Sequence, residues 1–231
     1  MSVEAHPRRS WHRGSFTSRL GKPAVDALFV VGHQITYPPG ARLSTQGEAT
    51  PPVRVVLDGV VKVFRLAQPE GSPVLVNVAG PGDLLSVEAA LLRRQSHTSH
   101  VAGIRTDCLV INQTKFRNFA ERHPGVHKAL TETMAAQVAL REAALAFANY
   151  SVRGRVIAFL SRMQAVFGRP SPWGIELDVG LSHIDLASAV GASVHAVAKV
   201  LAELRNEGVL ITGYRRMYVK VDLRELISKE S

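Results

Sequence analysis

The chain has 231 residues, enough for two compact domains, and 46% of them are hydrophobic. No apolar run approaches the roughly 20 residues of a membrane-spanning helix, and the N-terminus lacks the apolar segment of a secretory signal. The single cysteine, Cys108, excludes an internal disulfide and cannot by itself hold a structural zinc or an iron–sulfur cluster. The composition therefore predicts a cytoplasmic protein without metal or cofactor, and the net charge of +9 suits a polyanionic partner such as nucleic acid.

The first 22 residues are strongly basic. Their positive charges come from Arg8, Arg9, Arg13, Arg19 and Lys22, against one acidic residue. Such a segment is expected to be a mobile tail. Contact with DNA and a role in solubility are both open for residues 1–22.

Residues 23–125 have the punctuation of an antiparallel β-domain. Turn residues recur at short intervals in "YPPG", "TQGE", "PEGSP" and "GPGD", with no helix-length pattern between them. In "VRVVLDGVVKVFRL", Asp58-Gly59 separates two β-branched runs, which predicts a hairpin with a type I′ turn. A small barrel or sandwich is therefore favoured.

Helical periodicity begins in "INQTKFRNFAERHPG" and is broken at Pro124-Gly125. Residues 126–151 then run without Gly or Pro and are rich in good helix formers, which predicts one long helix. A 3-4-3-4-3 spacing places six residues on one seam of this helix: Thr131, Met134, Val138, Arg141, Leu145 and Ala148. The seam fits either packing on its own domain or a two-fold coiled-coil contact between two chains.

Residues 152–231 contain a helix-turn-helix pattern, "LSHIDLASAVGASVHAVAKVLAELRNEGVL". Ser182 and Asp185 form a capping box that opens the first helix, and Gly191 suits the tight turn. Ser193 then caps the second helix. The inner faces of the two helices are expected to be Leu186, Ala187, Val190, Val197, Val200, Leu201 and Leu204.

The outer face of the second helix is predicted to read DNA, because side chains near the N-terminus of such a helix reach base edges in the major groove. The following "GVLITGYRRMYVKV" predicts a wing, a two-stranded hairpin with cations at its tip. The candidate DNA-contacting residues are Ser182, Ser193, Val194, His195, Lys199, Arg215 and Arg216.

The chain resembles the Crp/Fnr family of bacterial transcription regulators over nearly all of residues 23–226. The resemblance is carried by "YPPGARLSTQGE", "VLDGVVKVFRL", "GPGDLL", "FRNFAERHPGVHKAL", "SVRGRVIAFL" and the winged helix-turn-helix. It implies an α+β fold: an N-terminal antiparallel β-roll of the cyclic-nucleotide-binding type, a long dimerisation helix and a C-terminal winged helix that binds a palindromic site. It also implies a homodimer with recognition helices about 34 Å apart, and RNA polymerase is a candidate partner.

The cassette that holds cyclic AMP in responsive members of that family is incomplete here. Gly82-Asp83 is retained, but the Gly-Glu pair reads Ser86-Val87, with Glu88 one place late. The Arg-Ser pair reads His97-Thr98 or Thr98-Ser99, so the arginine that grips the phosphate is missing. The places that present hydroxyls to adenine hold Arg141 and Glu142. The candidate effector-pocket residues are Gly82, Ser86, Val87, Glu88, His97, Thr98, Ser99, Arg141 and Glu142.

Two functions follow from these features. The first is a homodimeric transcription factor whose degenerate pocket does not bind cyclic AMP. The alternative is a regulator that responds to cyclic AMP or another small ligand and acts through protein contacts, with weak DNA binding. No P-loop, dinucleotide fingerprint or nucleophile elbow is present, so the sequence predicts neither catalytic residues nor an enzyme.

Overall fold

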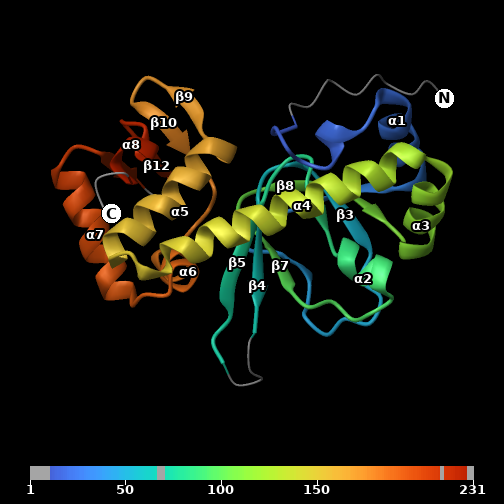
Figure 1. Cartoon of the computed structure of the whole chain (residues 1–231), viewed down its shortest axis with the longest axis horizontal. Coiled ribbons are helices and arrows are strands. Elements are labelled where there is room, and N and C mark those ends of the chain that lie inside the picture. The colour runs from blue at the N-terminus through green and yellow to red at the C-terminus, as the bar shows by residue number, and fades with distance from the viewer. Residues whose placement is uncertain (1–10, 67–70, 214–215, 228–231) are drawn as a thin grey trace.

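The computed structural model describes residues 11–66, 71–213 and 216–227. It confirms an α+β architecture with a β-roll, a long helix and a winged helix-turn-helix. In Figure 1 the long helix α4 (Pro124–Ala146) crosses from the β-roll on the right towards the helical body on the left.

The β-roll consists of two four-stranded antiparallel sheets. The first has the order β1 (His33–Tyr37), β8 (Thr106–Ile111), β3 (Val53–Asp58) and β6 (Leu84–Leu85). The second has the order β2 (Arg42–Ser44), β7 (Ser99–Ala102), β4 (Val61–Arg65) and β5 (Val74–Ala79). Apolar residues from both sheets, including Val56, Val61 and Cys108, form one buried cluster that is the interior of the roll.

The predicted hairpin at Asp58-Gly59 is wrong. Strands β3 and β4 lie in different sheets, where β3 pairs with β8 and β6 while β4 pairs with β5 and β7. Gly59 does have a positive φ of 86°, but Asp58 does not, so no type I′ turn forms. At this crossing between the sheets, Val60 N donates to Thr106 Oγ1 at 3.2 Å.

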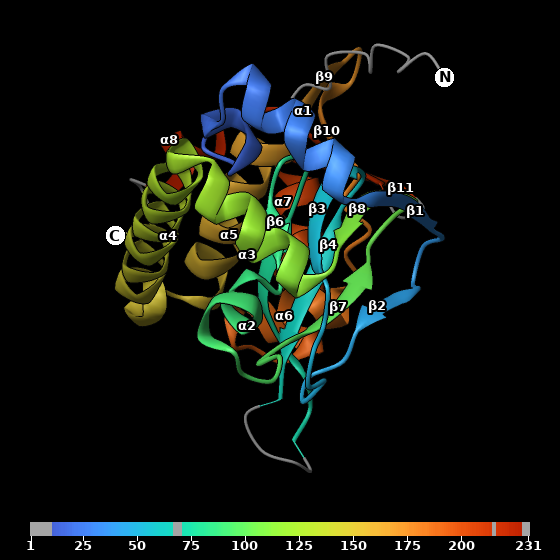
Figure 2. The ribbon, with the colours of Figure 1, turned by 90° about the vertical axis from the view of Figure 1, so that its right-hand side faces the viewer.

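Four helices and a short 3-10 turn accompany the roll. They are η1 (Thr17–Arg19), α1 (Lys22–Val31), α2 (Val87–Leu92), α3 (Gln113–Arg122) and α4. The sequence predicted α3 and α4 but neither α1 nor α2. Pro124 lies in the first turn of α4, where its missing N–H costs nothing. Figure 2 shows α1, α3 and α4 gathered on one side of the roll, where they cover the outer face of the first sheet.

The described part of the basic N-terminal segment is packed against the roll. Phe16 is fully buried in the cluster beneath α1 and α3, and Thr17 N donates to Gly82 O at 3.1 Å. Arg19 Nη1 lies 3.0 Å from Glu132 Oε2 on α4. The expected mobile tail therefore does not extend over residues 11–20, and Arg8 and Arg9 lie outside the described residues.

The C-terminal body is a winged helix. Its elements are α5 (Val152–Phe167), β9 (Arg169–Ser171), β10 (Gly174–Leu177), α6 (His183–Val190), α7 (Val194–Asn206), β11 (Leu210–Gly213), β12 (Arg216–Val219) and α8 (Leu223–Ile227). A short turn η2 (Phe147–Asn149) joins α4 to α5. The strands form one antiparallel sheet, and the break at "RPSPWG" is the β9–β10 hairpin.

No single helix in the described ranges is long and apolar enough to cross a bilayer. Helices α6 and α7 meet the length and composition criteria only as a pair, and that pair is bent by 105°.

Candidate functional site

The first helix of the helix-turn-helix opens on a complete capping box. Ser182 Oγ accepts from Asp185 N at 3.1 Å, while Asp185 Oδ2 accepts from both Ser182 N and Ser182 Oγ at 2.8 Å. The predicted capping box is thus confirmed. Because its hydroxyl is used within the cap, Ser182 fixes the start of α6 even though its surface is exposed.

The turn between the two helices also forms as predicted. Gly191 adopts a left-handed conformation with φ 63°, which a glycine accepts without steric cost. Ser193 Oγ accepts from Ala196 N at 3.1 Å and so caps α7. The inner faces of α6 and α7 are buried as expected, through Leu186, Ala187, Val190, Val197, Val200, Leu201 and Leu204.

The opposite face of α7 is open to solvent near its N-terminus. Val194 is 43% exposed, and His195 and Lys199 are exposed beside it. Within the described ranges, the side chains of His195 and Lys199 make no hydrogen bond or ion pair. These side chains are therefore available to a partner.

Sequence reasoning missed Ile184, the second residue of α6, which is 69% exposed beside Ser182. The signal was present, because a large aliphatic residue at an outward position of an amphipathic helix has no packing reason to be there.

The predicted wing hairpin is confirmed by the antiparallel pairing of β11 and β12, with Thr212 opposite Met217. Arg205 Nη1 at the end of α7 donates to Thr212 Oγ1 at 3.1 Å, so the wing is tied to the second helix. Arg215 lies outside the described residues. Arg216 begins β12, and only its backbone is described.

The retained Gly-Asp turn of the cassette is held by the N-terminal segment. Gly82 has a φ of 95°, and a Cβ at this position would meet the side chains of Ser15 and Thr17. Asp83 Oδ2 accepts from Gly80 N at 2.9 Å and lies 2.9 Å from His12 Nε2. Burial lowers the pKa of His12, but the hydrogen bond and charge of Asp83, together with the hydrogen bond to the Arg13 backbone, raise the pKa above its ordinary value.

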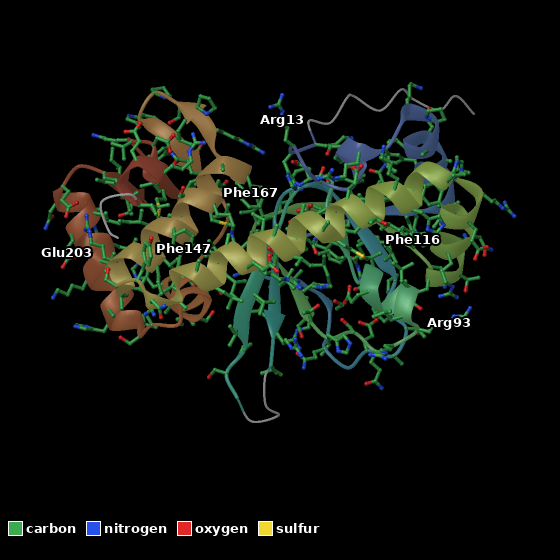
Figure 3. All side chains as sticks on the ribbon, viewed as in Figure 1. Arg13, Arg93, Phe116, Phe147, Phe167 and Glu203 are labelled. Atoms are coloured by element: carbon green, nitrogen blue, oxygen red, sulfur yellow. The ribbon has the colours of Figure 1, made fainter. Side chains whose placement is uncertain are left out.

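The residues at the Gly-Glu position are buried or partly buried and pack within the protein. Ser86 is 1% exposed with a left-handed φ of 58°, and its Oγ has no hydrogen-bond partner among the described residues. Val87 packs against the apolar cluster that contains Phe116, which is labelled in Figure 3, and Glu88 is partly buried in the first turn of α2. An apolar side chain therefore stands where a ribose-binding carboxylate is needed.

The residues at the Arg-Ser position are divided between solvent and internal bonds. His97 is exposed, whereas Thr98 Oγ1 lies 3.0 Å from His100 Nε2. Ser99 Oγ accepts from Gln46 N at 2.9 Å. The other ring nitrogen of His100, Nδ1, lies 2.7 Å from Ser44 Oγ. Burial, and then the charge of Arg54, lower the pKa of His100 to about 4, so the ring is neutral near pH 7.

Arg54 is a buried cation of the roll that the sequence reasoning did not consider. It is 6% exposed, and its guanidinium donates to Leu43 O at 2.6 Å and to Pro52 O at 3.3 Å. In the described part of the chain, no carboxylate lies within ion-pair distance of it. The signal was a single cation within the apolar six-residue strand β3.

Arg141 and Glu142 are exposed on the second half of α4, and no hydrogen bond between described residues joins them to the cassette. The same half of α4 leaves its apolar residues uncovered: Met134 is 39%, Val138 53%, Leu140 53% and Leu145 73% exposed. Only the first half packs on the roll, through Val126, Ala129, Leu130 and Thr133.

Comparison with known proteins gives two domain matches. Residues 34–123 match the cyclic nucleotide-binding domain, and residues 154–228 match the Crp-like helix-turn-helix domain.

Among the described residues, no group of three or more His, Cys, Asp or Glu is arranged to hold a metal ion.

A curated relative is the CRP-like cAMP-activated global transcriptional regulator of Mycobacterium tuberculosis, 25% identical over 80% of this chain and 83% of that protein. Among solved structures, FixK2 from Bradyrhizobium japonicum is 20% identical with a TM-score of 0.72, over 87% of this chain and 97% of that one. The c-di-GMP responsive regulator CLP from Xanthomonas campestris is 14% identical with a TM-score of 0.73, over 87% of this chain and 100% of that one. At these identities the two structural likenesses concern the fold.

Proposed function

The chain belongs to the Crp/Fnr family of transcription regulators, and on that premise we propose that it acts as a homodimer that binds a palindromic DNA site through two winged helices. The observation that carries the proposal is the open face of α7, where exposed side chains at the N-terminal end have no partner within the described chain. We assign residues 23–125 to the effector-type roll, 126–151 to dimerisation and 152–231 to DNA binding.

Each side chain of the open face has a defined role in this proposal. Val194 contacts a thymine methyl, His195 donates to a base or a phosphate, and Lys199 reaches guanine O6 and N7 or the backbone. The N-terminus of α7, capped by Ser193, presents backbone N–H groups to a phosphate. Arg215 and Arg216 of the wing add phosphate contacts.

The uncovered half of α4 supports the homodimer. Exposed Val138 and Leu145 recur on the predicted seam at coiled-coil spacing, and a second copy of the same helix would cover them. Two half-sites of DNA then follow from the two-fold symmetry of the protein. RNA polymerase is the further partner that we propose for a regulator of this kind.

We propose that the pocket does not take cyclic AMP in the manner of responsive relatives. Val87 packs into the apolar cluster, His97 points to solvent, and Thr98 is bonded to His100. None of the three supplies the charged grip that a cyclic phosphate or a ribose requires. The named relatives already differ in effector, since one is called cAMP-activated and another c-di-GMP responsive.

The test is binding of a selected palindromic duplex, followed by fluorescence anisotropy over a series of salt concentrations. Lys199→Ala with Arg215→Ala should weaken binding by about 100-fold and lower the salt slope by about 2. The matched control, Arg94→Ala with Lys115→Ala, removes the same charge from exposed positions of the roll and should leave binding within about twofold. Equal losses in both double variants would contradict the assignment.

A regulator that acts through protein contacts, with weak DNA binding, is the second candidate. It is favoured by Val194 and His195, because an apolar side chain and an imidazole at the positions that face the bases discriminate between bases only weakly. Wild-type protein that binds the palindrome no better than random duplex at physiological salt would support this candidate and overturn the first.

The pocket has its own test. We expect cyclic AMP to change neither the melting temperature nor the DNA affinity of the wild type. Val87→Glu with His97→Arg restores the missing carboxylate and guanidinium of the cassette and should create a measurable thermal shift with cyclic AMP. A large shift in the wild type would refute the proposed loss of cyclic AMP binding.

A further inference from the structure

The winged helix is docked tightly against the β-roll. Val60, Leu75 and Val78 of the roll belong to the same buried cluster as residues of α5, α6 and α7. Leu75 N donates to Ser188 Oγ on α6 at 3.1 Å. Gly103 of the roll and Gly180, just before α6, approach so closely that a Cβ on Gly180 would strike the Gly103 carbonyl. The two bodies therefore meet through side chains and backbone along a defined surface.

Lys62 is a charged residue of the roll that lies on this surface. Its neighbours on β4, Val61 and Val63, point into the roll interior, so Lys62 points out of the roll towards the winged helix. Its Nζ lies 3.0 Å from Asp185 Oδ2 and 3.4 Å from Gly180 O. The two charged side chains are only 14% and 10% exposed, which makes this a buried ion pair between the bodies.

The carboxylate oxygen that Lys62 contacts is the one that caps α6. Asp185 Oδ2 also accepts from Ser182 N and Ser182 Oγ. Helix α6 in turn is packed on α7 through the buried residues of the helix-turn-helix, so the position of Asp185 fixes the direction of the reading face. The roll thus holds the helix-turn-helix at the first turn of its first helix.

The geometry points to Lys62 as a positioning residue for DNA recognition, one that sets the separation of the two half-sites although it lies outside the DNA-binding domain. The inference rests on the proposed homodimer. The uncovered half of α4 continues a first half that is rooted in the roll, and Arg19 reinforces that root through Glu132. A dimer built on α4 places the two rolls, and the roll–winged-helix orientation then determines how far apart the two copies of α7 lie.

The experiment measures affinity for palindromes whose half-site spacing is lengthened or shortened by single base pairs, together with affinity for an isolated half-site. Wild-type protein should prefer one spacing by about tenfold or more, because both recognition helices must enter their grooves together. Lys62→Met should flatten this preference to about threefold or less while leaving half-site affinity within about twofold.

Lys62→Arg keeps the ion pair and should recover the spacing preference. Lys22→Met serves as the matched control, because Lys22 makes an exposed ion pair with Asp26 on α1, which lies at the other end of the molecule from α6 and α7 (Figure 1). Thermal unfolding of each variant identifies loss of fold, which would lower half-site affinity as well.

Lys62→Met protein with intact half-site binding and an unchanged spacing profile would overturn the inference. A wild type that binds no DNA would instead refute the proposed function, so the two failures are distinguishable.

Discussion

The helix-turn-helix and the cassette lie in the same chain but use polar residues in opposite ways. In the helix-turn-helix, Ser182 and Ser193 cap helices locally, and His195 and Lys199 on the open face of α7 keep their side chains exposed. In the cassette, polar groups are bonded within the protein: Asp83 faces the distant His12, and Thr98 bonds to its near neighbour His100, whose other ring nitrogen contacts Ser44. A surface ready for a partner keeps side chains open to solvent, whereas Asp83, Thr98 and Ser99 of the cassette are bonded within the protein.

The largest expected effect separates the two faces of α7. Leu201→Ala removes a side chain that is 1% exposed and should cost about 3 kcal/mol of unfolding free energy, through lost burial and a cavity. Val194→Ala, on the open face, should cost less than about 0.5 kcal/mol and yet weaken DNA binding. Urea unfolding combined with anisotropy checks both. Similar stability losses in the two variants would show that the open face is structural.

The next effect belongs to the roll interior. Burial lowers the pKa of His100 to about 4, against 6.5 in the unfolded chain, so the unfolded state binds the extra proton as the pH falls. The folded state should lose about 3 kcal/mol of stability between pH 6.5 and pH 4 from this residue.

The difference in unfolding free energy between wild type and His100→Gln isolates that contribution from the titrating carboxylates. His97→Gln is the matched control, because His97 is exposed three positions away. If His100→Gln and wild type lose stability in parallel over this pH range, burial and the charge of Arg54 do not hold the ring neutral.

Two serines at helix starts should respond with opposite signs. Ser193→Ala removes the cap on Ala196 N and should cost about 1 kcal/mol. Ser86→Gly should stabilise by up to about 1 kcal/mol, because Ser86 has a left-handed φ and a buried hydroxyl without a partner. Thermal unfolding of each variant measures the sign and size of the stability change. A loss on Ser86→Gly would mean that its hydroxyl is engaged in solution.

The same contrast explains how much the sequence could predict. The capping box, the turn at Gly191 and the wing follow from neighbouring residues, so the pattern alone located them. The hairpin at Asp58-Gly59 failed because strand pairing is decided by partners such as β8, far away in the chain. The short helix α2 begins at a strained Ser86 rather than at a recognisable cap, so no local signal announced it.

The retained Gly82-Asp83 located the candidate cassette in the sequence, but it did not predict how the other side chains of the cassette are packed and bonded. Val87 packs on the cluster with Phe116, and His100, which bonds Thr98, is itself held by Ser44, so both arrangements depend on residues far away in the chain. The buried Arg54 had a visible signal in its strand, yet its carbonyl partners could be named only from the folded structure.

The smallest expected effect tests whether the cassette turn depends on the N-terminal segment. Asp83 raises the pKa of His12 in the folded state, so the ion pair stabilises fully below the unfolded value of 6.5. That stabilisation is lost as the pH rises through the folded pKa.

The melting-temperature difference between wild type and His12→Gln should therefore shrink from pH 6 to pH 9, while exposed His33→Gln shows no such trend. A constant difference for His12→Gln would mean that residues 11–20 hold the turn through Thr17 and Phe16 alone. The turn of the helix-turn-helix differs, because Gly191 supplies its left-handed conformation and Ser193 caps the next helix from neighbouring positions in the chain.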